Sequence, residues 1–399
     1  MLKNLLHKNY LIFGGSIIVT RALEYLVLFF AAHYLSKDNY GELEYYKKII
    51  EVGSTVFAFG FPALIISYTK SKESKKYFFF LSFLFVLFIS FLFIPILGFF
   101  DWLFLLIPFI FYALFFNGGI TPAYLLVMKG SNFASLYKII ISFLFYCILF
   151  VSIYHFDVTG MSYVITTYVL SPIAIFYIVY ECYNQKLIKE KAKKYWRLFK
   201  KLLISSSTLV VSNFANLMFL YTDIFIIKIF SDNANAEIAD FSFALNISNM
   251  LLLIPLTLVQ VDIEKLKKIS GHLNTLNKKI ILLVFVSSIF LIGAFKALTL
   301  TIFVDFKETI TLFLIILVAK VFHALSSLFG TNLLIFKKFK ENLIVNVSML
   351  TLNIILCYIM YNHIGINGVA LASGISLFIR YLILIKLNKG LVPKTKITR

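Results

Sequence analysis

A few charged side chains lie deep inside long apolar stretches of this sequence, where an ionised group is costly. Arg21 lies near the middle of the stretch 10–34, and Lys320 lies near the middle of the stretch 309–335. On insertion scales such a charge costs about 2.5–3.5 kcal/mol unless it faces a cavity or a partner. The planar fork of arginine and the ammonium of lysine both bind phosphate oxygens. Arg21 and Lys320 are therefore candidate ligands for an anionic substrate in a central cavity.

Two carboxylates accompany these cations. Glu24 follows Arg21 by three residues, so the alternative role for Arg21 is an ion pair within one helix that only ties this helix to a neighbour. Asp223, in the stretch 202–230, has two interpretations. It binds a coupling ion or a proton, or it balances the charge of a buried cation. We assign Glu24 and Asp223 to coupling or charge balance.

A second tier of candidate site residues comprises His323, Lys228 and Arg380. His323 follows Lys320 by three residues, and a single histidine is more often structural than a titrating switch. Lys228, Lys296 and Arg380 lie within about two helical turns of the end of a stretch, from where a long basic side chain can reach the membrane interface. For these three cations we favour the interfacial interpretation over a binding role.

Other chemistry lacks the residues that it needs. The sequence has no glycine-rich loop followed by Lys and Ser or Thr, so no ATP site is built in. Cys147, Cys182 and Cys357 lie in apolar stretches without the spacing of a metal or redox motif. We therefore predict no metal, no cofactor and no enzymatic activity.

The composition excludes an ordinary soluble domain. The 399 residues are 60% hydrophobic and 14% charged, with a mean hydropathy of +0.90, whereas soluble chains are about 45–50% apolar and about 25% charged. The net charge of +19 would indicate nucleic acid in a soluble protein. Here the basic residues lie beside the ends of apolar stretches, where they favour anionic membrane lipids. We predict no nucleic-acid partner.

The apolar stretches have the length of membrane-spanning helices, which need roughly 20 residues to cross the hydrocarbon core. An all-α fold follows because a bilayer offers no hydrogen-bond partner to unpaired backbone groups, and the sequence lacks the alternation of apolar and polar residues that barrel strands show. We predict an all-α polytopic membrane protein with twelve transmembrane helices, at residues 10–34, 49–69, 77–99, 102–127, 135–155, 160–182, 202–230, 237–261, 280–304, 309–335, 342–362 and 366–386.

Most of the 38 Lys and Arg residues lie in the two tails and in every second gap between these stretches. Cationic loops are retained on the cytoplasmic side during insertion, so this alternation predicts that both termini are cytoplasmic. The first outer gap, from Ser36 to Lys48, departs from the pattern because it mixes basic and acidic residues.

The basic segment 186–201 divides the chain nearly in half. We predict an N-lobe over 1–185 with helices 1–6, this connector, and a C-lobe over 202–399 with helices 7–12 and a basic tail. The two lobes are expected to be related by a pseudo-two-fold axis, since Pro62 in the second span has a counterpart in Pro255 in the eighth. The connector is expected to form an amphipathic interfacial helix whose apolar residues face the acyl boundary: Leu187, Tyr195, Trp196, Leu198 and Phe199.

Three stretches resemble a known family. The first is Ala31-Ala-His-Tyr-Leu-Ser-Lys-Asp-Asn-Tyr-Gly41, followed by Phe59-Gly-Phe-Pro62; the second runs from Tyr221-Thr-Asp223 through Ile238–Leu245 to Pro255; the third contains Lys337-Lys-Phe-Lys340, Asn353 and Gly365–Ala372. In this order and spacing they look like the Wzx-type polysaccharide or O-antigen flippases of the multidrug/oligosaccharidyl-lipid/polysaccharide exporter superfamily. The resemblance covers essentially the whole chain.

This resemblance implies a multi-pass protein of the bacterial cell inner membrane that acts in polysaccharide biosynthesis, including that of lipopolysaccharide O-antigen. It implies translocation of undecaprenyl-pyrophosphate-linked oligosaccharide from the cytoplasmic to the periplasmic leaflet by alternating access. Membrane lipids, and the polymerase and chain-length regulator of the same pathway, are the implied partners. Arg21 and Lys320 fit the cationic cavity of such a flippase, and Asp223 matches an acidic position at the start of its second lobe.

Competing classes fit the residues less well. A cation-coupled multidrug or small-molecule exporter of the same superfamily is expected to carry more acidic than basic cavity residues. An O-antigen polymerase or a lipid-linked glycosyltransferase is expected to need a large outer loop, which the gaps do not provide. An amino-acid or ion carrier would more often show unwound, glycine-rich half-helices. We therefore rank the flippase first.

Overall fold

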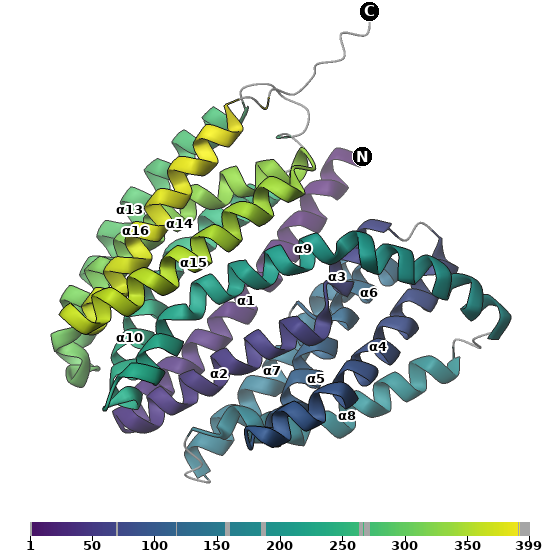
Figure 1. Ribbon diagram of the computed structural model, residues 1–399, viewed down its shortest axis with the longest axis horizontal. Helices are drawn as coiled ribbons and strands as arrows, with labels where there is room; N and C mark the ends of the chain where they lie inside the picture. Colours follow the sequence, from purple (N-terminus) through teal and green to yellow (C-terminus); the bar gives the residue numbers. More distant parts are fainter. Residues whose placement is uncertain are drawn as a thin grey trace, which may run out of the picture. The chain divides into compact units, whose positions relative to one another are not determined.

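The computed structural model describes residues 2–68, 71–116, 118–155, 160–184, 189–262, 266, 272–389 and 391. Within these ranges every regular element is a helix and there is no strand (Figure 1). The helices of the first half are α1 (Leu2–Tyr34), α2 (Lys37–Ala58), α3 (Phe61–Tyr68), α4 (Lys72–Phe99), η1 (Leu103–Leu105), α5 (Leu106–Phe115), α6 (Ile120–Lys129), α7 (Ser131–His155) and α8 (Ser162–Asn184). Those of the second half are α9 (Lys189–Phe230), α10 (Ala234–Asn249), η2 (Met250–Leu252), α11 (Leu253–Val261), α13 (His272–Thr301), η3 (Val304–Thr309), α14 (Ile310–Ile335), α15 (Phe339–Ile364) and α16 (Ile366–Asn388).

The helices follow the predicted spans closely. Among the described residues, 10 helical segments are long and apolar enough to cross a membrane. The two other predicted spans, 10–34 and 49–69, coincide with α1 and with α2 together with α3. The prediction of an all-α membrane protein is thus confirmed, while the count of twelve transmembrane helices and the cytoplasmic termini stay predictions.

Three of the predicted spans are interrupted rather than continuous, and a proline follows each break. A proline lacks the backbone N–H and has a fixed φ, so it fits the first turn of a helix and disrupts the interior. The break between α2 and α3 is made by Phe59 and Gly60, whose φ angles are 41° and 70°. The prolines that open the second part of each span are Pro62 in α3, Pro122 in α6 and Pro255 in α11.

The segment expected as the first outer gap between spans, Ser36 to Lys48, is helical from Lys37 onward. α2 begins at Lys37 and continues to Ala58. Lys37 forms an ion pair with Asp240 of α10 (Nζ–Oδ1 2.7 Å). Tyr40 is fully buried, and its hydroxyl accepts a hydrogen bond from Asn246 Nδ2 at 3.3 Å. The charges of this segment therefore belong to packed helix surfaces and not to a loop.

The chain forms two compact units. The N-terminal unit comprises residues 1–31 and 42–210, and the C-terminal unit comprises 32–41 and 211–399. In the N-terminal unit α3 and α6 pack together, and α4, α5, α7 and α8 complete the bundle. In the C-terminal unit α16 packs along both α14 and α15, and α10 packs on α14. The division at the connector stays a prediction, and residues 186–188 of the connector lie outside the described residues.

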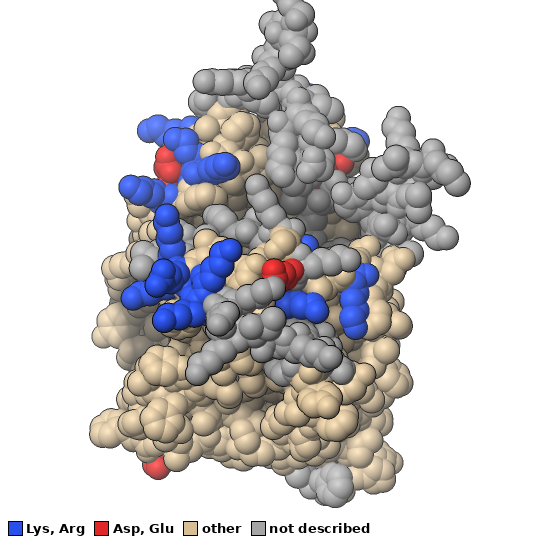
Figure 2. Space-filling model, turned by 90° about the vertical axis from the view of Figure 1, so that its right-hand side faces the viewer, with Lys and Arg blue, Asp and Glu red and all other residues tan. Residues whose placement is uncertain are grey.

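The rest of the basic connector, from residue 189, is helical and forms the start of α9. Phe199 is 1% exposed and stacks on Phe61 of α3, and Tyr195 stacks on Tyr77 of α4. These two rings pack on protein and not at the acyl boundary, contrary to expectation, whereas Trp196 and Leu198 are exposed. On the side of the molecule where α9 begins, basic side chains gather in a band above an almost uncharged surface (Figure 2).

Gly41 provides a test of this packing. A Cβ at this position would collide with the backbone carbonyl of Asn235, which opens α10, and a backbone atom cannot move aside as a side chain can. We expect Gly41→Val to lower the melting temperature of the purified protein, since overpacking typically costs about 1–3 kcal/mol. Gly293→Val is the matched control, because a Cβ there meets no atom within 4 Å. Equal melting temperatures for the two variants would contradict the close approach of α2 and α10.

Candidate functional site

One carboxylate ties three helices of the C-terminal unit together. Asp223 of α9 accepts hydrogen bonds at Oδ1 from Ser373 Oγ of α16 (2.6 Å) and from Asn353 Nδ2 of α15 (3.4 Å). The thiol of Cys357, also on α15, donates to the same oxygen at 3.5 Å. All four side chains are buried. Asp223 is therefore held by polar partners inside the unit, as expected of a charge inside a membrane protein.

Helical spacing places these groups. Residues three or four apart share a helix face, and the buried polar positions of α15 follow this rule: Asn342, Asn346, Asn353 and Cys357. On α16, Ser373, Ser376 and Arg380 lie on one buried face in the same way. These two polar stripes form a continuous seam of polar groups through the unit, together with the facing side of α9 and with Lys320 of α14, which shares a cavity with Asp223 and Ser373. We call this set the polar seam.

Arg380 lies in the polar seam and is only 7% exposed. Its Nη2 donates to Asn346 Oδ1 at 3.0 Å, and its guanidinium lies 5.8 Å from the ring centroid of Phe219. Asn346 in turn donates to Ser212 Oγ at 2.9 Å. Among the described residues Arg380 has no carboxylate partner, and its Nε makes no hydrogen bond. The expected reach of Arg380 to the membrane interface is therefore wrong.

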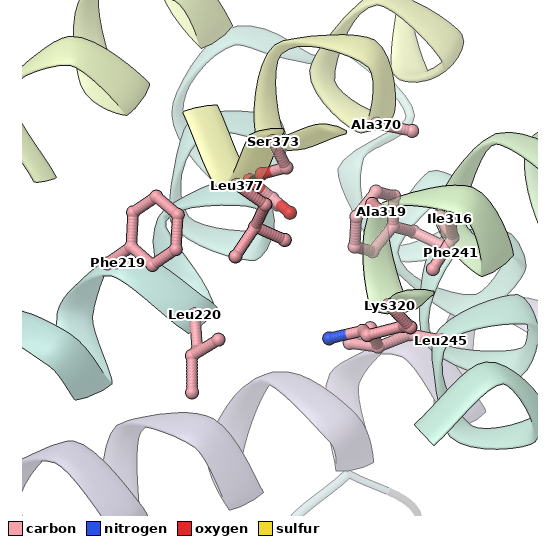
Figure 3. Close-up of a pocket in the computed structure, with 11 residues that line it drawn as sticks. Phe219, Leu220, Phe241, Leu245, Ile316, Ala319, Lys320, Ala370, Ser373 and Leu377 are labelled. Atoms are coloured by element: carbon pink, nitrogen blue, oxygen red, sulfur yellow. Dashed lines mark hydrogen bonds between the residues drawn. The ribbon is translucent and has the colours of Figure 1, made fainter. Parts of the chain in front are cut away.

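Asp223 and Lys320 line one small cavity. Figure 3 shows the amino group of Lys320 pointing into this space from α14, with Ser373 on another side of it. The cavity holds about 20 Å³, room for about one water molecule and far too little for a sugar. Both charged groups can thus exchange a proton or bind a water here, but the cavity is not the passage for a large substrate.

Positive charge exceeds negative charge in the polar seam. Lys320 and Arg380 contribute two buried cations, and Asp223 is the facing carboxylate. His323 lies within electrostatic reach of both cations, and its Nδ1 is buried without a hydrogen-bond partner. The structure therefore brings together four of the predicted site residues: Asp223, Lys320, His323 and Arg380.

Arg21 and Glu24 lie in the N-terminal unit and form the ion pair expected from their spacing, with Nη1–Oε2 at 2.6 Å. The side chain of Arg21 is 47% exposed, whereas that of Glu24 is 6% exposed. Glu24 has a second partner, Lys47 of α2, with Nζ–Oε1 at 2.7 Å. One buried carboxylate thus serves two cations, of which only Arg21 is accessible.

Sequence reasoning missed Lys47, because it placed this residue in the gap between the first two predicted spans. The missing signal was the helical spacing of the charges in this segment, at i, i+3, i+4 and i+7: Glu44, Lys47, Lys48 and Glu51. Lys48 lies 3.9 Å from Glu44, and both are buried. Two acidic and two basic residues therefore compensate one another on a largely buried helix surface.

The remaining second-tier residue, Lys228, donates to Asn235 Oδ1 at 2.7 Å. This contact ties the end of α9 to the start of α10, so Lys228 has a protein partner near the helix end. Lys296 of α13 is exposed, in keeping with the interfacial role expected for it.

Residues 6–263 match the model of a family described as "Polysaccharide biosynthesis protein". The fold is similar to that of the lipid II flippase MurJ in an inward closed conformation, with a TM-score of 0.64 and 16% identity over 94% of this chain and 87% of that chain. It is equally similar to an inward-facing multidrug resistance MATE family transporter of the MOP superfamily, with a TM-score of 0.64 and 14% identity over 92% and 94% of the two chains.

A mutant of the Vibrio cholerae MATE transporter VcmN gives a TM-score of 0.56 at 11% identity, over 97% of each chain. At such identities the likeness shows a shared fold and no more. No curated protein matches the sequence significantly.

The hydrogen bond between Asn346 and Arg380 can be tested by substitution. Asn346→Leu leaves Nη2 of Arg380 without its acceptor in a buried place, where an unsatisfied group costs about 1–3 kcal/mol or more when charged. We expect a clear fall in the melting temperature of the purified protein. Asn346→Asp is the comparison, because its carboxylate still accepts from Arg380. It gives up the hydrogen bond that Asn346 Nδ2 donates to the backbone carbonyl of Ser212 at 3.2 Å, so we expect a smaller fall than for Asn346→Leu. If both variants melt like the wild type, Asn346 does not support Arg380.

Proposed function

The chain belongs to the polysaccharide biosynthesis protein family, and from this premise we propose that it is a flippase for a lipid-linked oligosaccharide. Its substrate is undecaprenyl-pyrophosphate-linked oligosaccharide, an O-antigen or a related repeat unit. It moves this substrate from the cytoplasmic to the periplasmic leaflet by alternating access. The shared fold with a lipid II flippase supports the class of transporter.

The observation that carries this proposal is the surplus of cations in the polar seam. A pyrophosphate cannot cross hydrocarbon without compensating charge, while a polyprenyl tail can stay in the bilayer throughout. Buried Lys320 and Arg380 give the C-terminal unit a positive interior. Arg21 adds an accessible guanidinium in the N-terminal unit. Both features suit an anionic headgroup.

The proposal includes an arrangement in the cell. Twelve transmembrane helices with both termini in the cytoplasm place the basic loops on the side where the lipid-linked substrate is made. We assign the protein to the bacterial inner membrane as a multi-pass protein. Its partners there are membrane lipids and, in the same pathway, the polymerase and the chain-length regulator.

A cation-coupled multidrug or small-molecule exporter is the second candidate, because the fold is as similar to a MATE transporter as to MurJ. The charges argue against it. Such an exporter takes up cationic compounds more readily when acidic residues dominate its interior, and the polar seam is predominantly basic. Resistance to cationic drugs that depends on this protein would favour the exporter.

Asp223 serves as the charge-balancing residue in this proposal. It shares a water-sized cavity with Lys320 and accepts hydrogen bonds from three side chains, an arrangement that stabilises the ionised carboxylate. The alternative, a role for Asp223 as the coupling residue, requires the carboxylate to change its charge during transport.

The cationic residues give the first test of the function. We expect Arg21→Ala and Lys320→Ala each to abolish surface polysaccharide in cells that lack the native gene, because the pyrophosphate then loses a cation that compensates it. Immunoblotting of the membrane fraction checks that each variant is present. Lys296→Ala, which removes an exposed cation of α13, is the control and should leave the polysaccharide unchanged. Normal polysaccharide in both Arg21→Ala and Lys320→Ala cells would refute the proposed binding role.

The role of Asp223 needs a separate test. We expect Asp223→Asn, which keeps the shape but removes the charge, to lower the melting temperature because Lys320 loses its nearby counter-charge. Asp223→Asn combined with Lys320→Met should recover the melting temperature but not the surface polysaccharide. Loss of polysaccharide in Asp223→Asn cells with an unchanged melting temperature would instead identify Asp223 as the coupling residue.

A further inference from the structure

Glu24 of α1 is bound from two sides by cations of different accessibility. Arg21 approaches Oε2 at 2.6 Å and Lys47 approaches Oε1 at 2.7 Å, so the two cations do not compete for the same oxygen. The side chain of Lys47 is 4% exposed, against 47% for Arg21. Lys47 is therefore closed off from any substrate, while Arg21 is open to one.

The surroundings of Lys47 hold it in place. It lies on α2 beside Lys48, and both lysines are flanked by Glu44 and Glu51, of which Glu44 is fully buried. A lysine at such a site keeps its proton only because carboxylates surround it. The pair of Lys47 and Glu24 is thus a fixed, buried ion pair, and Arg21 is an additional cation at its outer edge.

This arrangement has a consequence for Arg21. If Arg21 were the sole counter-ion of Glu24, turning the guanidinium towards a phosphate would leave an uncompensated carboxylate in the interior, which is strongly unfavourable. With Lys47 on the other oxygen, Glu24 stays compensated when Arg21 leaves. Arg21 can then move from the Glu24 carboxylate to a phosphate with little net change in free energy.

We propose that Lys47 is a positioning residue for substrate binding: it retains Glu24 while Arg21 moves from that carboxylate to the phosphate of the substrate. Lys47 itself does not touch the substrate. The inference rests on the proposed function, and it adds a residue on a second helix to the binding site. Arginine suits the moving role because its fork binds carboxylate and phosphate alike.

The test compares Lys47→Met with Lys47→Arg and with the double variant Glu24→Gln/Lys47→Met. Binding of geranylgeranyl pyrophosphate to the purified full-length protein in detergent is measured by titration calorimetry, with geranylgeraniol as the uncharged probe. We expect Lys47→Met to weaken pyrophosphate binding about tenfold or more, because Arg21 is then locked to Glu24. Lys47→Arg and the double variant should bind about as the wild type does.

A second readout needs no substrate. Phenylglyoxal modifies accessible arginines, and mass spectrometry follows its reaction with Arg21, with exposed Arg197 of α9 as the internal reference. Lys47→Met should slow the modification of Arg21 but not of Arg197, and Glu24→Gln should accelerate it. An unchanged rate in Lys47→Met overturns the role of Lys47 whatever the substrate is.

The two failures are distinguishable. If the wild type does not bind the pyrophosphate, or binds geranylgeraniol equally well, the proposed function is overturned. If the wild type binds the pyrophosphate but Lys47→Met binds it equally well, only the role of Lys47 is overturned. Should Lys47→Met fail to fold, the double variant decides, because it removes both members of the buried ion pair: weak pyrophosphate binding by the folded double variant overturns the inference.

Discussion

An ionised side chain inside a bilayer has no water to compensate it, so each charge between these helices needs a partner from a neighbouring helix. The polar seam of the C-terminal unit follows from this constraint. Asp223 draws a hydroxyl, an amide and a thiol from two other helices onto one oxygen. Arg380, on the same seam, is held by the amide of Asn346 and the face of Phe219. Polar side chains thus fix which faces of α9, α15 and α16 meet.

The two units meet the same constraint in different ways. In the N-terminal unit, buried acidic and basic residues of α2 lie close together and compensate one another, and Glu24 is shared by Arg21 and Lys47. In the polar seam the cations exceed the carboxylates, so a positive interior persists. A neutral cluster with one accessible arginine, together with a cationic seam, can attract an anionic headgroup while the other charges stay buried.

The spans were predictable because hydropathy depends on local composition, and even the breaks coincide with prolines visible in the sequence. What could not be predicted depends on tertiary partners. Ser36 to Lys48 was expected to be a gap between spans because charges are usually solvated, yet Lys37, Lys47 and Lys48 each pair with a carboxylate on a helix. Arg380 lies near a span end, and nothing local reveals that Asn346, which is itself bonded to Ser212, holds it inside the unit. The pairing of Arg21 with Glu24 was visible in their spacing, whereas the third member of that cluster was not.

The assignment of residues 32–41 to the C-terminal unit has a consequence for how the protein is made. Lys37 and Gly41 pack against α10, whose first residues leave the ribosome about 200 residues later, a delay on the order of 10–40 s at usual rates of synthesis. During that interval the newly inserted half carries an uncompensated lysine and an uncovered helix surface in the membrane. Co-translational assembly of this protein therefore cannot proceed lobe by lobe: the first half stays unfinished until translation has passed well into the second.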